Sequence, residues 1–429
     1  GVSFVQLVEL AAGPLQSHIS VRAKLQVWPD ELYRHAETLE ILDLSDNALS
    51  ALPADFSKFQ KLQRLFLTNN QFREIPAVLA SCPNLRMVSF KGNQLEQFAT
   101  GVFAEALEWL ILTDNQLTEL PDDFGRYNQL KKLALAGNRL SKLPQSMQQC
   151  QQLGLIRLSL NTFSEFPSWL FRLPKLAWLS LGANPATPVS VVQASGDQIP
   201  SHQLADYQLQ QQIGIGASGV IYQALSPDQQ LVAVKMFKGW VTSDGCPRDE
   251  LANYLNAGNH QNLIPILAAL ADEQEPGLVM ALIPKTFASL GHPPSFTTIT
   301  RDTFPQGLIY SRAQVLGMAR QVASVLVHLQ AKNIAHGDLY AHNMLIDANQ
   351  QLLLGDFGAA TALAALPAQQ QLDFKALEVR AFGYWLADIC GLMPEVPVDF
   401  IALYQQCLQD DVSARPAIQS IHQQLLAMQ

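Results

Sequence analysis

The chain has 429 residues, of which 48% are hydrophobic and only 15% are charged, so most of it must fold, into two or more domains. Its net charge of −9 argues against nucleic acid or an anionic membrane as the main partner, because both attract basic surfaces. No apolar segment is long enough to cross a bilayer, the start lacks the basic residues of a signal peptide and the five cysteines are scattered, so we expect a cytoplasmic protein without a membrane span.

Asparagines recur in the first half of the chain at intervals of 22 or 23 residues. Each closes the pattern L-x-x-L-x-L-x-x-N, and most copies continue to an apolar residue followed by proline, as at Leu120-Pro121. One copy, a short strand with a turn and a return segment, cannot bury its apolar face alone, so neighbours must stack. We expect the leucines to point inward and the asparagine amides to bond the backbone where it bends. The asparagines are Asn47, Asn70, Asn93, Asn115, Asn138, Asn161 and Asn184.

This pattern resembles the leucine-rich repeat. The resemblance implies an α/β solenoid, or horseshoe, of about seven repeats over residues 38–185. Residues 1–37 then hold an N-terminal cap and a degenerate first repeat. Residues 186–206 are polar and lose the periodicity, so we interpret them as a linker.

Two positions of each predicted strand face the concave side of the stack, where polar side chains are usual. Aromatic and aliphatic residues share these columns here, which favours a binding patch for a protein substrate or regulator, or for the second half of this chain. The alternative is that they are ordinary exposed apolar residues. The candidate partner-binding residues are Ile41, Phe66, Met87, Trp109, Ile111, Leu155 and Trp178.

Four motifs follow one another in the second half of the chain. Glycines let a backbone approach phosphates closely, and carboxylate and amide oxygens are the ligands that Mg²⁺ prefers. A glycine loop alone is weak evidence, but all four motifs in this order and spacing predict ATP-dependent phosphoryl transfer. The motifs are Gly214-x-Gly216-x-x-Gly219-x-Ile221, Val232-Ala-Val-Lys235, His336-Gly-Asp338 followed by Asn343, and Asp356-Phe-Gly358.

The motifs resemble the protein kinase family, and the resemblance extends over residues 207–429. It implies an α+β bilobal fold, with an N-lobe at 207–283 and a C-lobe at 284–429, that uses ATP and Mg²⁺. The residues implied to bind ATP are Gly214, Ile215, Gly216, Ala217, Gly219, Ile221, Ala233, Lys235, Met280, Leu282 and Leu345.

The resemblance also implies roles in catalysis. Lys235 would bind the α- and β-phosphates and pair with a helix glutamate, for which Glu250 is the candidate and Asp249 the rival. Asp338 would orient the substrate hydroxyl and take its proton, and His336 would be structural. The residues implied to hold Mg²⁺ are Asn343, which would also stabilise the catalytic loop, and Asp356.

Several positions depart from the family pattern. Gly337 stands in place of the usual Arg, Tyr340 in place of the Lys typical of Ser/Thr kinases, and His342 where tyrosine kinases often carry Arg. The segment after Asp356 is short, lacks Ala-Pro-Glu and offers Thr361 as its hydroxyl, so we do not expect control by loop phosphorylation. For the long segment at residues 284–311 we have no account beyond an insertion near the hinge.

The leading hypothesis is a protein kinase that phosphorylates Ser/Thr hydroxyls and is recruited or regulated by its repeats. One alternative is a small-molecule kinase, because His336-Gly-Asp-Leu339 also resembles aminoglycoside and choline kinases. The other is a pseudokinase scaffold, which the eroded activation segment favours and the complete set of catalytic side chains disfavours.

Overall fold

The computed structural model of the chain describes residues 4–189, 199–215, 218–238, 245–272 and 276–429. It divides into two compact units, Gly1–Lys175 and Leu176–Gln429. The boundary lies inside the last copy of the repeat, before the predicted linker at 186–206. The last strand of the repeat pattern therefore belongs by its contacts to the second unit.

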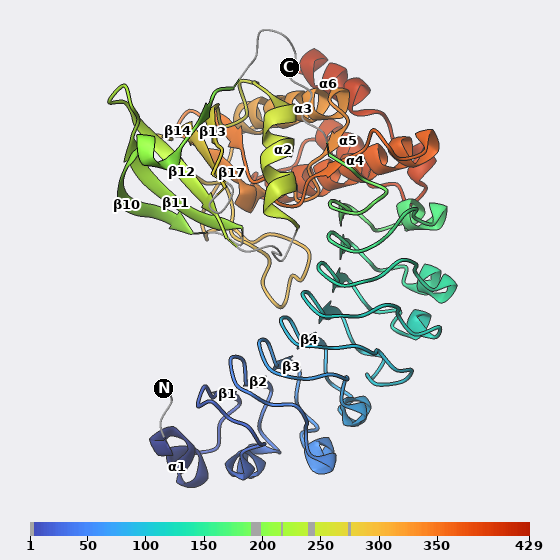
Figure 1. The fold of residues 1–429 in the computed structure, drawn as a ribbon. Coiled ribbons are helices and arrows are strands. Elements are labelled where there is room, and N and C mark those ends of the chain that lie inside the picture. Colours follow the sequence, from blue (N-terminus) through green and yellow to red (C-terminus); the bar gives the residue numbers. More distant parts are fainter. Residues whose placement is uncertain (1–3, 190–198, 216–217, 239–244, 273–275) are drawn as a thin grey trace. The chain divides into compact units, whose positions relative to one another are not determined.

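The first unit is a stack of short parallel strands, as the repeat pattern predicts (Figure 1). Helix α1, at Phe4–Ala12, and strand β1, at His18–Ser20, precede the regular copies. Strands β2 to β7 follow at Ile41–Asp43, Arg64–Phe66, Met87–Ser89, Trp109–Ile111, Lys132–Ala134 and Leu155–Arg157. Side chains alternate along a strand, so the middle residue of each points inward. All six middle residues are fully buried: Leu42, Leu65, Val88, Leu110, Leu133 and Ile156.

The return segments contain short 3₁₀ helices that start just after the prolines of the pattern. Proline fixes φ near −65°, and Pro53, Pro76, Pro144 and Pro167 each occupy the position before such a helix. The helices are η1 at Asp30–His35, η2 at Ala54–Lys58, η3 at Ala77–Ser81, η4 at Phe124–Arg126, η5 at Gln145–Gln149 and η6 at Ser168–Arg172.

The repeated asparagines tie each copy to the one before it. The Nδ2 group of Asn70 donates to the carbonyl oxygen of Leu44, 2.9 Å away in the preceding copy, and to that of Leu67 at 3.1 Å. Its Oδ1 accepts from the backbone N–H of Leu49 at 3.0 Å. The same pattern recurs at Asn93, Asn115, Asn138 and Asn161. This confirms the predicted role of the asparagine amides.

The second unit begins with the last repeat strand, β8 at Trp178–Ser180, and continues into a six-stranded sheet in the order β10-β11-β12-β14-β13-β9. These strands span Ser201–His202 (β9), Gln208–Ile215 (β10), Gly219–Leu225 (β11), Leu231–Phe237 (β12), Ile266–Leu270 (β13) and Gly277–Ala281 (β14). One face is closed by a core that includes Tyr207, Val232, Val234 and Val279. Helix α2, at Pro247–Ala257, lies between β12 and β13 in the chain.

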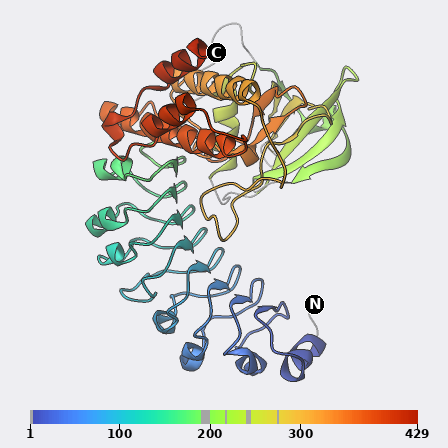
Figure 2. The ribbon, with the colours of Figure 1, turned by 180° about the vertical axis from the view of Figure 1, so that it is seen from behind.

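The rest of the second unit is mainly helical (Figure 2). Its helices are α3 at Arg312–Ala331, α4 at Ala368–Cys390, α5 at Val398–Cys407 and α6 at Ile418–Ala427. Helix α3 packs against α4 and α6, and α4 packs against α5. Short strands carry the motif loops between them: β15 at Ala288–Ser289, β16 at Ile334–Ala335, β17 at Met344–Ile346, β18 at Leu352–Leu354 and β19 at Thr361–Ala362. Among the helices that the structure describes, none has both the length and the hydropathy needed to cross a membrane.

Candidate active site

A buried ion pair joins the sheet of the second unit to helix α2. The Nζ atom of Lys235, on β12, lies 2.6 Å from Oε2 of Glu250, and the two side chains are 8% and 1% exposed. Glu250, and not the rival Asp249, is therefore the partner of this lysine. Burial raises the pKa of Glu250, and the Lys235 ammonium opposes that shift. The ionised form of Glu250 is therefore stabilised by the Lys235 ammonium beside it.

Strand register brings several predicted ATP-binding residues to one face of the sheet. Lys235 lies directly opposite Ile221 on β11, and Ala233 lies opposite Met280 on β14. Directly opposite residues point to the same face, as do residues two apart on one strand, so all four side chains share a face. Gly214 continues this row, since it pairs with Ile221.

The remaining predicted ATP-binding residues have different positions. Leu282 lies beyond the end of β14 and lines a cavity of about 720 Å³ with Val232 and Val279, which face away from Lys235. Leu345 belongs to strand β17, in a separate small sheet, and Ile215 at the end of β10 is 70% exposed. Gly216 and Ala217 lie outside the described residues. Gly219 starts β11, where a Cβ atom would lie 2.1 Å from the carbonyl oxygen of Met236.

The loop at residues 336–343, which we call the catalytic loop, is fixed by its own side chains. The Nδ2 group of Asn343 donates to the carbonyl oxygen of Asp338 at 2.7 Å and to its Oδ2 at 2.8 Å. His336 bonds the carbonyl oxygen of Gly355 through Nε2 at 2.9 Å, and its ring contacts Phe357 edge-on at 5.4 Å. This geometry gives His336 the structural place that the sequence predicts.

Asp356 is held in a left-handed conformation beside the ion pair. Its φ is 58°, its side chain accepts from the N–H of Gly358 at 3.1 Å, and its own N–H donates to the hydroxyl of Tyr254 at 2.9 Å. The charge of Asp356 also contributes to the raised pKa of Glu250, so the carboxyls are neighbours. Tyr254 was missed by the sequence analysis, although it follows Glu250 by one helical turn and so shares its buried face.

The donor set suits a hard cation. Both of the hydrogen bonds described for the Asn343 amide use its nitrogen, so its Oδ1 is the oxygen that could bind a metal, and Asp356 supplies a carboxylate. Mg²⁺ takes one or two such protein oxygens together with phosphate oxygens and water. The residues present therefore fit Mg²⁺ bound with a nucleotide.

Helix α4 supports the catalytic loop through the side chain of Glu378. The Glu378 side chain accepts from the backbone N–H groups of His336 and Gly337, and it is 1% exposed. The helix begins at Ala368, so Glu378 lies in its buried middle.

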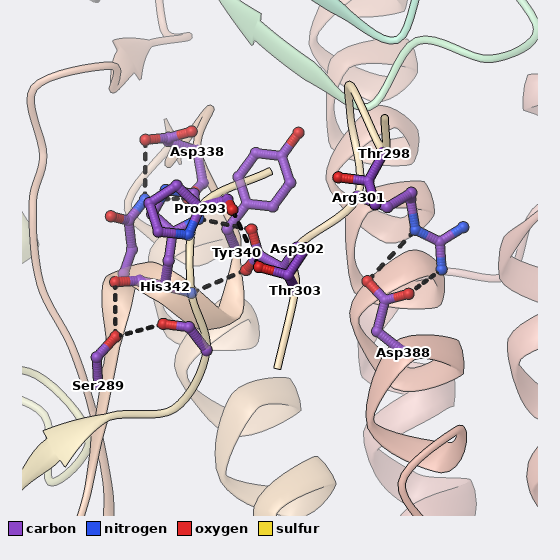
Figure 3. Close-up of polar contacts among 12 residues, drawn as sticks. Ser289, Pro293, Thr298, Arg301, Asp302, Thr303, Asp338, Tyr340, His342 and Asp388 are labelled. Atoms are coloured by element: carbon purple, nitrogen blue, oxygen red, sulfur yellow. Dashed lines mark hydrogen bonds and ion pairs between the residues drawn. The ribbon is translucent and has the colours of Figure 1, made fainter. Parts of the chain in front are cut away.

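The unexplained insertion before residue 311 packs on the catalytic loop (Figure 3). Asp302 accepts from the backbone N–H of His342 at 2.9 Å and pairs with its Nδ1 at 2.7 Å. The Tyr340 hydroxyl donates to the carbonyl oxygen of Thr300 at 2.9 Å. Arg301 anchors the segment by an ion pair with Asp388 of α4. Two of the positions that depart from the family pattern, Tyr340 and His342, are thus held by this insertion.

Trp178 of strand β8 is not an exposed concave residue. It is 1% exposed and stacks between Tyr340, at a centroid distance of 4.4 Å, and Tyr384, at 5.3 Å. Its indole N–H donates to the carbonyl oxygen of Leu339 at 3.1 Å. The sequence left open either a separate partner or the second half of this chain as the occupant of the patch. At this residue the second half occupies it, because the catalytic loop covers Trp178, so the prediction of an open surface is wrong here.

The other predicted concave residues divide by exposure. Met87 and Leu155 are only 5% and 8% exposed and offer little surface. The nitrogen of Lys132 lies 3.9 Å from the ring centre of Trp109. The half-buried members of the set are Ile41, Phe66, Trp109 and Ile111.

Gly337 shows why arginine is absent from its position. Its φ is 79°, and a Cβ atom would lie 2.5 Å from the carbonyl oxygen of Ala359 and 2.9 Å from that of Leu179. Gly307 has nearly the same φ, 78°, with no atom within 4 Å of a Cβ.

We expect Gly307→Ala to cost about 1–2 kcal/mol of folding stability through backbone conformation alone. Gly337→Ala should cost about 1–3 kcal/mol more because of the clash, measured by denaturant unfolding. Equal losses in the two variants would contradict the packing described here.

Comparison with known proteins agrees with both halves of this description. Residues 207–375 match the protein kinase domain family, and overlapping segments between residues 22 and 185 match the leucine rich repeat family. The chain therefore consists of leucine-rich repeats followed by a protein kinase domain. This confirms the predicted fold class, a repeat solenoid followed by a kinase fold.

Individual relatives include both serine/threonine and tyrosine kinases. The leucine-rich repeat receptor-like protein kinase PXC1 of Arabidopsis thaliana is 28% identical over 203 residues, which are 43% of this chain and 29% of that protein. The serine/threonine-protein kinase US3 of human herpesvirus 1 is 30% identical over 146 residues, 34% and 27% of the two chains. The tyrosine-protein kinase Fer of Rattus norvegicus is 26% identical over 159 residues, 36% and 17%. The chain spans less than a third of the length of each of these relatives.

Proposed function

We propose that the chain is an ATP- and Mg²⁺-dependent protein kinase that phosphorylates Ser/Thr hydroxyls of a protein substrate. The buried pair of Lys235 and Glu250 carries the proposal. It fixes an ammonium group on the sheet face shared by Ile221, Ala233 and Met280, beside the carboxylate of Asp356. A cation held in this way suits the phosphates of a nucleotide, because preorganised charge stabilises phosphoryl transfer without reorganisation.

The side chains of the site would divide the work as follows. ATP, when bound, supplies the phosphoryl group; Asn343 and Asp356 would hold Mg²⁺, which would neutralise phosphate charge. Asp338 orients the substrate hydroxyl and accepts its proton while the hydroxyl oxygen bonds to the γ-phosphorus and the bond from that phosphorus to the ADP oxygen breaks. Lys235 binds the α- and β-phosphate oxygens. Asn343 keeps Asp338 in place through the two bonds donated by its amide.

Two other functions deserve a test. One observation favours a small-molecule kinase. Tyr340 stands in place of the Lys typical of Ser/Thr kinases, and its side chain is 4% exposed and occupied by contacts within the protein, so it is not presented to a protein substrate. A pseudokinase scaffold is disfavoured because Lys235, Glu250 and Asp338 are all present in an ordered arrangement.

Transfer of labelled phosphate from γ-labelled ATP by the purified full-length chain separates these functions, with Asp338→Ala as the control. Label on the chain itself or on a general protein substrate, confined to phosphoserine and phosphothreonine, supports the proposal. Label only on aminoglycoside or choline supports the small-molecule alternative. Nucleotide binding without transfer supports the scaffold, and phosphotyrosine alone would revise the substrate class.

We further propose that the half-buried concave residues Ile41, Phe66, Trp109 and Ile111 recruit a protein partner or regulator, in the cytoplasm. Trp109→Ala should weaken capture of the partner by about 30-fold or more, because a buried tryptophan at an interface centre commonly contributes 2 kcal/mol or more. Alanine is preferable to aspartate, whose carboxylate would pair with Lys132. Trp169→Ala, on helix η6, is the matched control. Capture that is equal in both variants would remove this surface from the proposal.

A further inference from the structure

Two of the three positions at which the catalytic loop departs from the kinase pattern, Gly337 and Tyr340, are positions at which it meets the last leucine-rich repeat, residues 176–187. Gly337 leaves room for the carbonyl oxygen of Leu179, which a Cβ atom would approach to 2.9 Å. Tyr340 provides the ring that stacks on Trp178, with an angle of 11° between the planes. A small residue and an aromatic one thus replace two basic residues where the loop must accept a repeat strand.

The same repeat also contacts the segment that follows Asp356. The backbone N–H of Leu181 donates to the hydroxyl of Thr361 at 2.9 Å, and Thr361 is fully buried.

The contact with Trp178 extends into a continuous stack of rings. Tyr384 of α4, Trp178, Tyr340 and His342 follow one another at centroid distances of 5.3, 4.4 and 4.9 Å. The last ring pairs with Asp302 of the insertion. The stack passes through Tyr340, just before η8 at Ala341–Asn343, and through His342 within η8, so it restricts the loop that holds Asp338.

We propose that the last leucine-rich repeat is a working part of the kinase, with Trp178 as a positioning residue for the catalytic loop. Trp178 holds the peptide that follows Asp338, since its indole N–H bonds the carbonyl of Leu339. The proposal rests on the kinase activity proposed above. It makes this repeat a part of the active site, because strand β8 contacts the loop that holds Asp338.

The test compares Trp178→Ala and Trp178→Phe with the matched control Trp169→Phe in the full-length chain. Displacement of a reacting group by about 1 Å can cost about 100-fold in rate, so we expect Trp178→Ala to lower kcat by about that factor. Trp178→Phe keeps a stacking ring and loses only the N–H donor, so it should retain an intermediate kcat. The KM for ATP and the stoichiometry of nucleotide binding should stay within about twofold, because the phosphate-binding lysine lies on the sheet and not on this loop.

A second readout separates positioning from general damage. Hydrogen–deuterium exchange should rise at residues 334–346 in Trp178→Ala and stay unchanged across the sheet strands β10 to β14. Unchanged kcat and unchanged exchange in Trp178→Ala would overturn the inference, as would a loss of nucleotide binding in proportion to the loss of activity. If the wild-type chain transfers no phosphate, the proposed function fails, and the exchange measurement alone decides whether the repeat orders the loop.

Discussion

Asp338→Asn is expected to lower kcat by about 10²–10⁴, the range that a positioned general base contributes. The amide has the shape of the carboxyl group, and the carbonyl oxygen of residue 338 would still accept from Asn343. The substituted side chain cannot take the proton of the substrate hydroxyl. The KM for ATP should change little, because Lys235 and the sheet are not altered. Steady-state transfer of γ-phosphate to a protein substrate measures both constants.

The matched control for this substitution is Glu395→Gln. It makes the same change from carboxyl to amide on an exposed residue of the second unit. Its kcat should equal that of the unaltered chain. If Asp338→Asn retained more than about a tenth of the original kcat, a role for Asp338 as the base would be untenable.

Lys235→Met is expected to damage both activity and stability. Loss of the cation should reduce kcat/KM by about 10²–10³, the cost of removing one preorganised donor to a developing charge. The substitution also leaves Glu250, whose side chain is 1% exposed, without its cation. Breaking a buried ion pair by removing one partner costs about 3–5 kcal/mol of folding stability. Denaturant unfolding of the second unit measures that loss.

The pH dependence of the Lys235→Met variant carries a definite sign. Burial raises the folded-state pKa of Glu250 above its ordinary value of 4.5, and removing Lys235 removes the opposing effect. The folded state then binds the Glu250 proton more tightly than the unfolded state does. The variant should therefore be most stable below pH 4.5 with respect to this group and should lose that stability as pH rises through the raised pKa.

The double variant Lys235→Met with Glu250→Leu distinguishes the two effects. Replacing both charges by apolar side chains removes the stranded carboxyl, so most of the lost stability should return while activity stays lost. A double variant as unstable as Lys235→Met would show that the pair is not the source of the damage.

The parts of the site that are close in sequence were the ones that could be predicted. The glycine, lysine and aspartate motifs each determine a local turn or strand, and Asn343 reaches Asp338 within five residues. The sequence could not decide whether Glu250 or Asp249 pairs with Lys235, because adjacent residues on a short helix differ only in the face they present. The buried Tyr254, four residues after Glu250, indicates which face points inward.

The parts that could not be predicted depend on residues far apart in the chain. Asp302 meets His342 across 40 residues, and Trp178 meets Leu339 across 161. Neither pair leaves a periodic pattern in the sequence. Trp178 also occupies the strand position that faces solvent in an ordinary repeat, so its column suggested a binding surface without deciding between a separate partner and the second half of the chain. The rings that cover it belong to Tyr340 and Tyr384, and nothing in the spacing of these tyrosines indicates that contact.

The position of strand β8 has a practical consequence for anyone who wants to express the catalytic part alone. The change in composition near residue 186 invites a cut there, but such a fragment would lack Trp178 and Leu181, and the hydroxyl of Thr361 would lose its backbone donor. A fragment starting a few residues before Leu176 would keep them, although its new end would expose apolar residues that a preceding repeat normally shields. One polar capping repeat grafted ahead of Leu176 would be the safer boundary for crystallisation or inhibitor screening.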